Sequence, residues 1–331
     1  MKKILNSPDS YVDEMLEGMC QAHPDVYRRC GPQGRVMVRA HPASGKTGVV
    51  SGGGSGHLPL FTGYVGSGLL DAAAIGDVFA SPTVDQICET IRQAHHGQGV
   101  LLLYGNYGGD VMNFDMAAEM VEPEGIHTAT VLLADDVVSA LPHEKEMRRG
   151  TGGLVYAFKI AGAAAHEGAS LGETSRIAQK TADACRSVGM ALTPCTVPQA
   201  GTPTFTIGDE DMEMGMGIHG EPGIRREKLK KADQIAQEML ELLLDDRPIG
   251  KTETVSVMIN SLGATPPEEL YIVYRCVNDI LSGHDVRIDM PLVGRYATSM
   301  EMTGMTMTLC LLDDELRRLL HAPCNCAFWR V

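Results

Sequence analysis

Short apolar segments that alternate with helical ones constrain the fold of this chain more than any other feature. Residues 99–104 and 128–134 are apolar runs of strand length, bounded by glycines or polar residues. A helical pattern precedes each run, at 84–96 and at 111–121. Strands that alternate with helices in this way predict an α/β domain with a largely parallel sheet.

The rest of the chain continues this pattern. The Ala- and Gly-rich region 153–188 predicts a long helix that bridges two halves of the molecule. Further strands are predicted at 35–39, 48–50, 190–197, 254–260 and 306–312, and further helices at 224–244 and 314–320. A threonine followed by proline at 265–266, with Glu268 after it, predicts a capping box at the start of another helix.

We therefore expect an α/β fold with two lobes, each a sheet flanked by helices. The predicted N-terminal lobe covers residues 1–185 and contains a glycine-rich loop, and the C-terminal lobe covers residues 186–331. A length of 331 residues is enough for two such lobes.

Composition excludes several classes of protein. A chain with 44% hydrophobic and 21% charged residues has the balance of a folded globular protein. The net charge of −14 argues against a nucleic-acid partner, since such proteins need clustered cations. The one dense basic run, 225–231, is interpreted as a solvated helix face. The sequence has neither a signal-peptide core nor an apolar stretch of bilayer length, so we expect a cytoplasmic protein without a membrane partner.

Motifs for metal and nucleotide binding are missing. The nine cysteines include no CxxC pair, so reduced and mostly buried thiols are expected, and no metal site. The Gly45–Lys46–Thr47 segment is not a P-loop, because Ala40 stands where that motif needs glycine. If a nucleotide takes part in the function, it is expected to be held elsewhere.

The most unusual segment is residues 51–57, Ser-Gly-Gly-Gly-Ser-Gly-His. Glycines allow backbone N–H groups to converge on a ligand oxygen, so this segment is interpreted as a cradle for a phosphate or a hydroxyl. The alternative is a tight turn from strand to helix, with His57 as a cap.

Three other residues are candidates for a site. Asp110 follows a predicted buried strand, and ligands collect at the carboxyl ends of such strands; its alternative role is a helix N-cap. Ser81 precedes a proline and is either a helix cap or a partner for a ligand hydroxyl. His219 lies among glycines in a loop and is either a structural histidine or a nucleophile that adds to a carbonyl carbon.

Taken together, these segments resemble the K subunit of dihydroxyacetone kinases, the substrate-binding component of that family. The resemblance extends over nearly the whole chain. It is carried, in chain order, by segments 52–57, 79–83, 106–110, 217–223, 262–266 and 302–305.

The resemblance implies roles for five residues. His219 matches the histidine that holds a short-chain ketose as a hemiaminal. Asp110 would be the base for the terminal hydroxyl, and His57 would hydrogen-bond the substrate and assist formation of the hemiaminal. Gly54 and Ser81 would lie at the substrate.

The resemblance also implies partners. The K subunit is expected to be a homodimer and to bind no cofactor itself. A separate helical L subunit would carry ATP or ADP with magnesium, and in many bacteria a phosphotransferase-system protein recharges that nucleotide. The physical argument agrees, because phosphoryl transfer needs a cationic clamp that this sequence does not offer.

The chain departs from the family pattern after His57, where Leu58 stands in place of the usual glutamate. We therefore expect dihydroxyacetone or a related ketose such as erythrulose as the substrate. The alternative function is a ketose-binding sensor or transcriptional coactivator without turnover. The presence of Asp110 favours catalysis.

Overall fold

The computed structural model describes residues 2–331, and its strands form two sheets. The first sheet has six strands in the order β1-β2-β4-β3-β5-β6. Strands β3, β4, β5 and β6 are parallel, while β1 and β2 extend the sheet in the antiparallel sense. The bounds are β1 Tyr27–Cys30, β2 Val36–Arg39, β3 Gly48–Ser55, β4 Ala72–Val78, β5 Val100–Gly105 and β6 Thr128–Leu133. The predicted parallel α/β lobe is confirmed.

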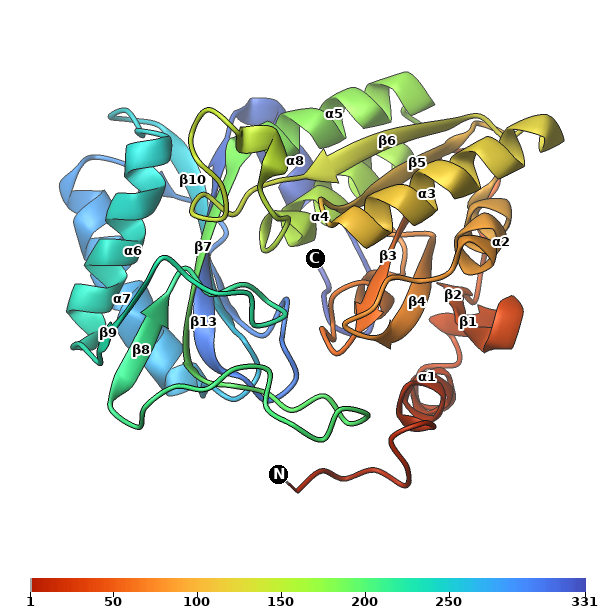
Figure 1. The fold of residues 1–331 in the computed structure, drawn as a ribbon. Helices are drawn as coiled ribbons and strands as arrows, with labels where there is room; N and C mark the ends of the chain where they lie inside the picture. The colour runs from red at the N-terminus through yellow and green to blue at the C-terminus, as the bar shows by residue number, and fades with distance from the viewer. Residues whose placement is uncertain (1) are drawn as a thin grey trace.

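Helices cover both faces of this sheet (Figure 1). On one face α2 (Val84–Ala94) and α3 (Gly108–Val121) enclose an apolar cluster. On the other face α1 (Tyr11–Ala22), α4 (Gly153–His166), α5 (Leu171–Ala184) and α8 (Asp314–His321) share the main core of the molecule. Short 3₁₀ helices lie at Pro32–Gly34, Thr62–Tyr64, Glu122–Glu124 and Lys145–Met147.

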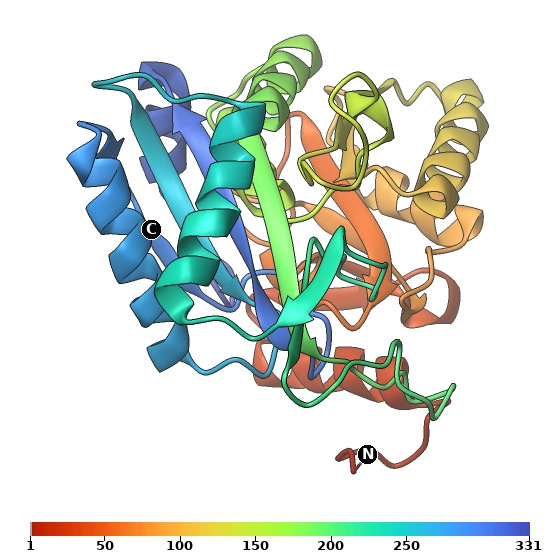
Figure 2. The same cartoon turned by 60° about the vertical axis from the view of Figure 1, so that its left-hand side comes forward.

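The second sheet is mostly antiparallel and carries two helices on its outer face (Figure 2). Its main order is β11-β10-β13-β7-β8-β9, and β12 also pairs with β10. Helices α6 (Ala232–Asp246) and α7 (Pro267–Gly283) pack on it around a second core. The strands are β7 Cys185–Thr193, β8 Asp211–Met214, β9 Arg225–Lys228, β10 Thr254–Ser261, β11 Arg287–Ile288, β12 Leu292–Gly294 and β13 Thr303–Leu312.

The predicted bridging helix at 153–188 is wrong in its length. It is two helices, α4 and α5, and β7 already begins at Cys185. Gly168 adopts φ +91°, a left-handed conformation that glycine accepts readily, and Ser170 then caps α5 by accepting from the backbone N–H of Glu173. The alanine-rich composition that predicted one helix therefore conceals a turn.

Three other local predictions are corrected. The basic run at 225–231 does not open a helix, because Arg225–Lys228 is the edge strand β9 and α6 begins only at Ala232. The strand predicted at 190–197 is β7, which spans 185–193. Thr265 does not cap α7: Pro266 is the N-cap residue, and the Thr265 hydroxyl instead donates to the Gly304 carbonyl at 2.7 Å.

The C-terminal segment returns to the first sheet. After α8, the backbone of Asn325 exchanges hydrogen bonds with that of Ser67, and the ring of Trp329 meets that of Tyr64 edge-on at 6.3 Å. Buried Cys324 and Cys326 belong to the main core beside the first sheet. The chain passes from the first sheet to the second before residue 185, and its C-terminal segment returns to the first. The lobe boundary predicted near residue 185 therefore stays a prediction.

Over residues 2–331 the helices are all too short or too polar to cross a membrane. In the same range, no group of three or more His, Cys, Asp or Glu side chains is arranged to hold a metal ion.

Candidate functional site

The candidate residues of the first lobe meet at one edge of its sheet. Strands β3, β4 and β5 are parallel, so their carboxyl ends lie side by side. His57 follows β3, Ser81 follows β4, and Asp110 lies in the first turn of the helix that follows β5. This is the edge of an open parallel sheet at which ligands ordinarily bind.

The glycine run is a strand and not the predicted loop, since β3 continues through Ser55. A Cβ on Gly53 would lie 2.3 Å from the ring of Phe61. A Cβ on Gly54 would lie 2.7 Å from the Ala80 backbone nitrogen and 2.8 Å from the Phe79 Cα. The glycines therefore allow neighbouring segments to approach β3 closely, and this gives a packing reason for Gly54.

His57 is buried, with 1% of its surface exposed, and one ring nitrogen is fixed. Nδ1 lies 2.6 Å from the Thr298 carbonyl oxygen, which can only accept, so the proton belongs on Nδ1. Nε2 is buried and has no protein partner. Burial, with the nearby His219 as a second cause, lowers the pKa of His57 to about 3. The ring is therefore neutral, with an acceptor nitrogen available for a ligand hydroxyl.

His219 lies on the loop between β8 and β9, opposite His57. The two imidazole rings are 4.7 Å apart and nearly perpendicular, at 77°. The backbone N–H of His219 donates to Glu221 Oε2, and His219 Nδ1 lies 2.9 Å from Glu221 Oε1. The side chain of His219 is 25% exposed, so a ligand can reach it. The fold thus brings the two predicted histidines, one from each lobe, to a single point.

Asp110 completes the cluster. Its carboxyl is buried, and Oδ1 has no protein partner. Burial raises the pKa of Asp110 to about 6, although a hydrogen bond from Ser81 and the charge of His219 act in the opposite direction. A carboxyl with this pKa can accept a proton near neutral pH.

The capping roles considered for Ser81 and Asp110 are wrong. Thr83 is the N-cap of α2 and forms a capping box with Gln86. Tyr107 occupies the N-cap position of α3. Both candidate side chains are therefore free of helix capping.

The sequence reasoning named no role for two aromatic residues in this cluster. The Phe79 ring stacks on His57 at 4.8 Å and meets His219 at 5.3 Å. The Tyr107 ring meets His219 edge-on at 4.9 Å, and its hydroxyl donates to the Gly150 carbonyl. Both residues lie inside segments that carry the family resemblance. Only their position next to Ser81 and Asp110 could have indicated a role.

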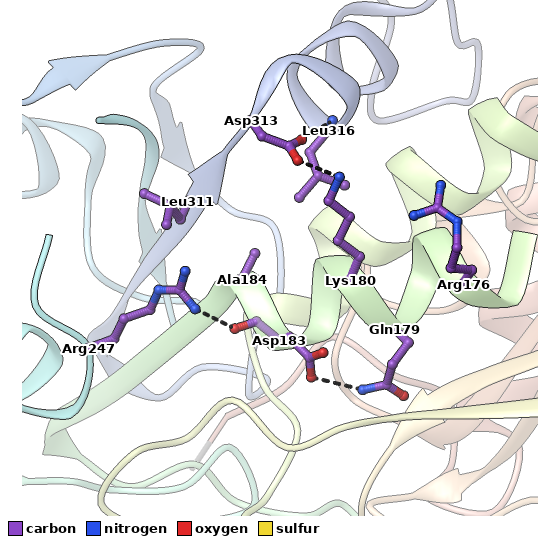
Figure 3. A pocket seen from close by; sticks show the side chains of 9 residues that line it. All are labelled: Arg176, Gln179, Lys180, Asp183, Ala184, Arg247, Leu311, Asp313 and Leu316. Atoms are coloured by element: carbon purple, nitrogen blue, oxygen red, sulfur yellow. Dashed lines mark hydrogen bonds and ion pairs between the residues drawn. The ribbon is translucent and has the colours of Figure 1, made fainter. Parts of the chain in front are cut away.

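A pocket elsewhere on the surface has different chemistry (Figure 3). It has a volume of about 520 Å³ and lies between α5 and the start of α8. Its lysine and one of its arginines already have internal partners: Lys180 pairs with Asp313 and Glu315, and Arg176 pairs with Glu173 and Glu315. The third cation, Arg247, contacts the Asp183 carbonyl at 3.3 Å. The pocket contains none of the predicted site residues.

Comparison with known proteins identifies the family. The family model described as the Dak1 domain matches residues 17–328. The chain is 44% identical to the dihydroxyacetone-binding subunit DhaK of PTS-dependent dihydroxyacetone kinase 1 from Listeria innocua, and the match covers 95% of each chain. The chain belongs to the dihydroxyacetone kinase family.

Two further members of this family are named for different functions. An L-erythrulose kinase of Pectobacterium atrosepticum is 40% identical over all of this chain, which spans 56% of that longer protein. A solved structure of the dihydroxyacetone kinase operon co-activator DhaQ matches with a TM-score of 0.89 and 31% identity, over 96% of this chain and 98% of that one. The two-lobed α/β fold is thus shared with solved structures of a dihydroxyacetone kinase and of this co-activator.

Proposed function

We propose that this chain is the ketose-binding subunit of a dihydroxyacetone-type kinase. The observation that carries the proposal is the convergence of His219, His57 and Asp110 at the carboxyl ends of β3 and β5. The three supply a nucleophile, a neutral hydrogen-bond acceptor and a base. The identity to a dihydroxyacetone-binding subunit over 95% of both chains supports the same function.

In this proposal, Nε2 of His219 attacks the carbonyl carbon of the ketose. The new N–C bond displaces the carbonyl π electrons onto oxygen, which takes a proton from solvent, and the ring releases its Nδ1 proton. The product is a neutral hemiaminal, so atoms and charge balance. The acceptor Nε2 of His57 would receive a hydrogen bond from a ketose hydroxyl. Only carbonyl compounds form this adduct, so polyols are rejected.

The covalent adduct would orient the terminal hydroxyl for phosphoryl transfer, which is an entropic advantage. Asp110 would take the proton of this hydroxyl as its oxygen attacks the phosphorus atom. A helical L subunit would carry the nucleotide together with magnesium. The phosphoryl donor would be ATP, or a bound ADP that a phosphotransferase-system protein recharges in some organisms. We also propose that this chain works as a homodimer.

The identity of the ketose forms part of the proposal. Leu58 lies next to His57, and its carbonyl accepts a hydrogen bond from the Thr298 hydroxyl at 2.9 Å. The carbonyl of Thr298 in turn fixes Nδ1 of His57. This hydrogen bond uses the backbone of residue 58, so a glutamate there would act on His57 through its side chain and not through this contact. With an L-erythrulose kinase among the relatives, we favour erythrulose over dihydroxyacetone.

The deciding experiment is phosphoryl transfer to dihydroxyacetone and to erythrulose with the matching L subunit, in wild type and Asp110→Ala. We expect turnover that falls at least about a hundredfold in the variant, since proton transfer contributes about 10²–10⁴. A faster reaction with erythrulose would support the tetrose, and a strong preference for the triose would contradict it. The same measurement on Leu58→Glu shows how the residue at position 58 affects the preference between the two ketoses.

The second candidate function is a ketose-responsive co-activator, favoured by the likeness to DhaQ at a TM-score of 0.89. A co-activator would form the adduct and bind a transcription factor but support no turnover with any L subunit. Adduct formation without turnover in the experiment above would therefore favour it.

A further inference from the structure

Glu221 holds His219 with both of its carboxylate oxygens. Oε1 lies 2.9 Å from His219 Nδ1, and Oε2 accepts the backbone N–H of the same residue at 2.9 Å. One carboxylate thus fixes the backbone and the ring of a single histidine. Burial alone would raise the pKa of Glu221, but His219, a backbone N–H and Arg149 together lower it to about 2. The group is therefore ionised at neutral pH.

Glu221 is itself held from the other side. Arg149 lies on the segment between β6 and α4, and its Nη1 is 3.8 Å from Glu221 Oε2. The guanidinium of Arg149 donates twice to Asp136 Oδ2, at 2.8 and 3.1 Å, and once to the Gly215 carbonyl at 3.2 Å. Asp136 is 1% exposed. Asp136, Arg149 and Glu221, from two distant segments, therefore form a connected series of charged side chains that ends at the His219 ring.

The space beside these charged side chains admits no residue larger than glycine at position 217. A Cβ on Gly217 would lie 2.2 Å from Glu221 Oε2 and 2.5 Å from Arg149 Nη1. The backbone N–H of Gly217 donates to the Glu221 carbonyl at 3.0 Å, which closes the loop around the histidine. Gly217 therefore permits Glu221 and Arg149 to approach one another.

We propose that Glu221 is a positioning residue that fixes the tautomer of His219, with Arg149 and Asp136 holding its carboxylate in place. An ionised carboxylate only accepts, so the ring proton must lie on Nδ1 and the lone pair on Nε2. Nε2 is then the nucleophile. The same carboxylate stabilises the positive charge that the ring acquires as the N–C bond forms, before the Nδ1 proton leaves. The catalytic consequence rests on the proposed function, while the tautomer does not.

The Glu221→Gln variant tests this tautomer directly. The backbone N–H of His219 and the nearby Arg149 guanidinium both require an oxygen at the Oε2 position, so the amide NH₂ must face Nδ1. That NH₂ donates, which forces the ring proton onto Nε2 and removes the lone pair. Glutamine thus preserves the shape and reverses the hydrogen bond. Glu227→Gln is the matched control, because Glu227 lies on the edge strand β9 and pairs only with the surface cations Arg225 and Lys230.

The readouts are the ring ¹⁵N shifts of His219, assigned by comparison with His219→Ala, and adduct formation with ¹³C2-labelled dihydroxyacetone. We expect the proton on Nδ1 in wild type, Glu227→Gln and Glu221→Asp, and on Nε2 in Glu221→Gln. Adduct formation should slow at least about tenfold, and only in Glu221→Gln. The reason is that a catalytic histidine held in the wrong tautomer loses most of its rate.

The two ideas fail in different ways. An Nδ1 proton that persists in Glu221→Gln, or unchanged adduct formation in that variant, overturns the positioning role and leaves the ketose-binding function intact. The expected tautomer switch without any adduct in the wild type overturns the function and retains the tautomer assignment. If Glu221→Gln does not fold, Arg149→Met is the substitute, with slower adduct formation expected and an unchanged rate contradicting the role.

Discussion

His57 and His219 face each other with ring centroids 4.7 Å apart, although one follows a strand of the first sheet and the other lies on a loop of the second. At this distance two imidazolium ions would repel strongly in a buried site. The depressed pKa of His57, about 3, keeps that ring neutral whatever charge His219 acquires. A transient positive charge on His219 during the proposed adduct formation would therefore be tolerated.

Replacement of His219 by alanine should abolish the ketose adduct while the fold persists. The side chain is partly exposed, and its loss leaves Glu221 without its ring partner, which should cost about 1–3 kcal/mol. Carbon-13 NMR of labelled dihydroxyacetone detects the adduct, and thermal unfolding reports stability. His143→Ala, at an exposed loop position, is the control that should retain the adduct. A persistent adduct in His219→Ala would place the covalent bond elsewhere.

Asp110→Asn should stabilise the protein at neutral pH while it removes turnover. The pKa of Asp110 is about 6 in the fold and near 4 when unfolded, so the native state binds more protons between these values and stability falls as pH rises through them. Above pH 6 the variant avoids this cost and should gain roughly 1–3 kcal/mol, which disappears below about pH 4. Urea unfolding at pH 4 and pH 8 measures it. An equal gain at both values would refute the ionisation argument.

Ser81→Ala should move the acid limb of the pH–rate profile to higher pH. The hydrogen bond from Ser81 favours the ionised form of Asp110, so its loss raises the pKa of the base further. A shift of roughly 0.7 pH unit is expected, since one hydrogen bond is worth about 1 kcal/mol. The measurement is kcat/KM against pH with excess L subunit. No movement of the limb would mean that another group sets it.

Gly54→Ala should destabilise the protein by about 1–3 kcal/mol or prevent its folding, because the new Cβ would meet backbone atoms of Phe79 and Ala80 that cannot yield. Gly18→Ala is the matched control. Gly18 lies in α1 with no atom near its Cβ position, so alanine there should stabilise by about 0.5–1 kcal/mol. Chemical denaturation of both variants decides. A neutral Gly54→Ala would mean that the segment after β4 can move away.

The sequence predicted the strands of both sheets well where apolar runs are bounded by polar or glycine residues, as at Val100–Gly105 and Thr128–Leu133. It failed where composition was uniform. The turn between α4 and α5 is concealed among alanines, and the edge strand Arg225–Lys228 is made of charged residues whose pairing with β8 decides their conformation. Pairing of this kind depends on neighbours distant in sequence and has no local signal.

The candidate site could be predicted in its members but not in its arrangement. Motifs indicated His57, Asp110 and His219, and the fold brings all three together. The roles of Arg149 and Asp136 depend on distances between segments that only the folded chain defines. Glu221 lies in the segment 217–223, two residues after His219, and this spacing was the one feature of the sequence that could have indicated its role.

The return of residues 322–331 to the first sheet has a consequence for how the protein is made. Ser67 and Tyr64 obtain their partners Asn325 and Trp329 only after every strand of the second sheet has been synthesised. The earlier lobe therefore remains incomplete on the ribosome and exposes part of its core until translation has passed these residues. Because His57 and His219 come from opposite lobes, and Nδ1 of His57 contacts the Thr298 carbonyl, the site also assembles only after most of the second lobe has been synthesised.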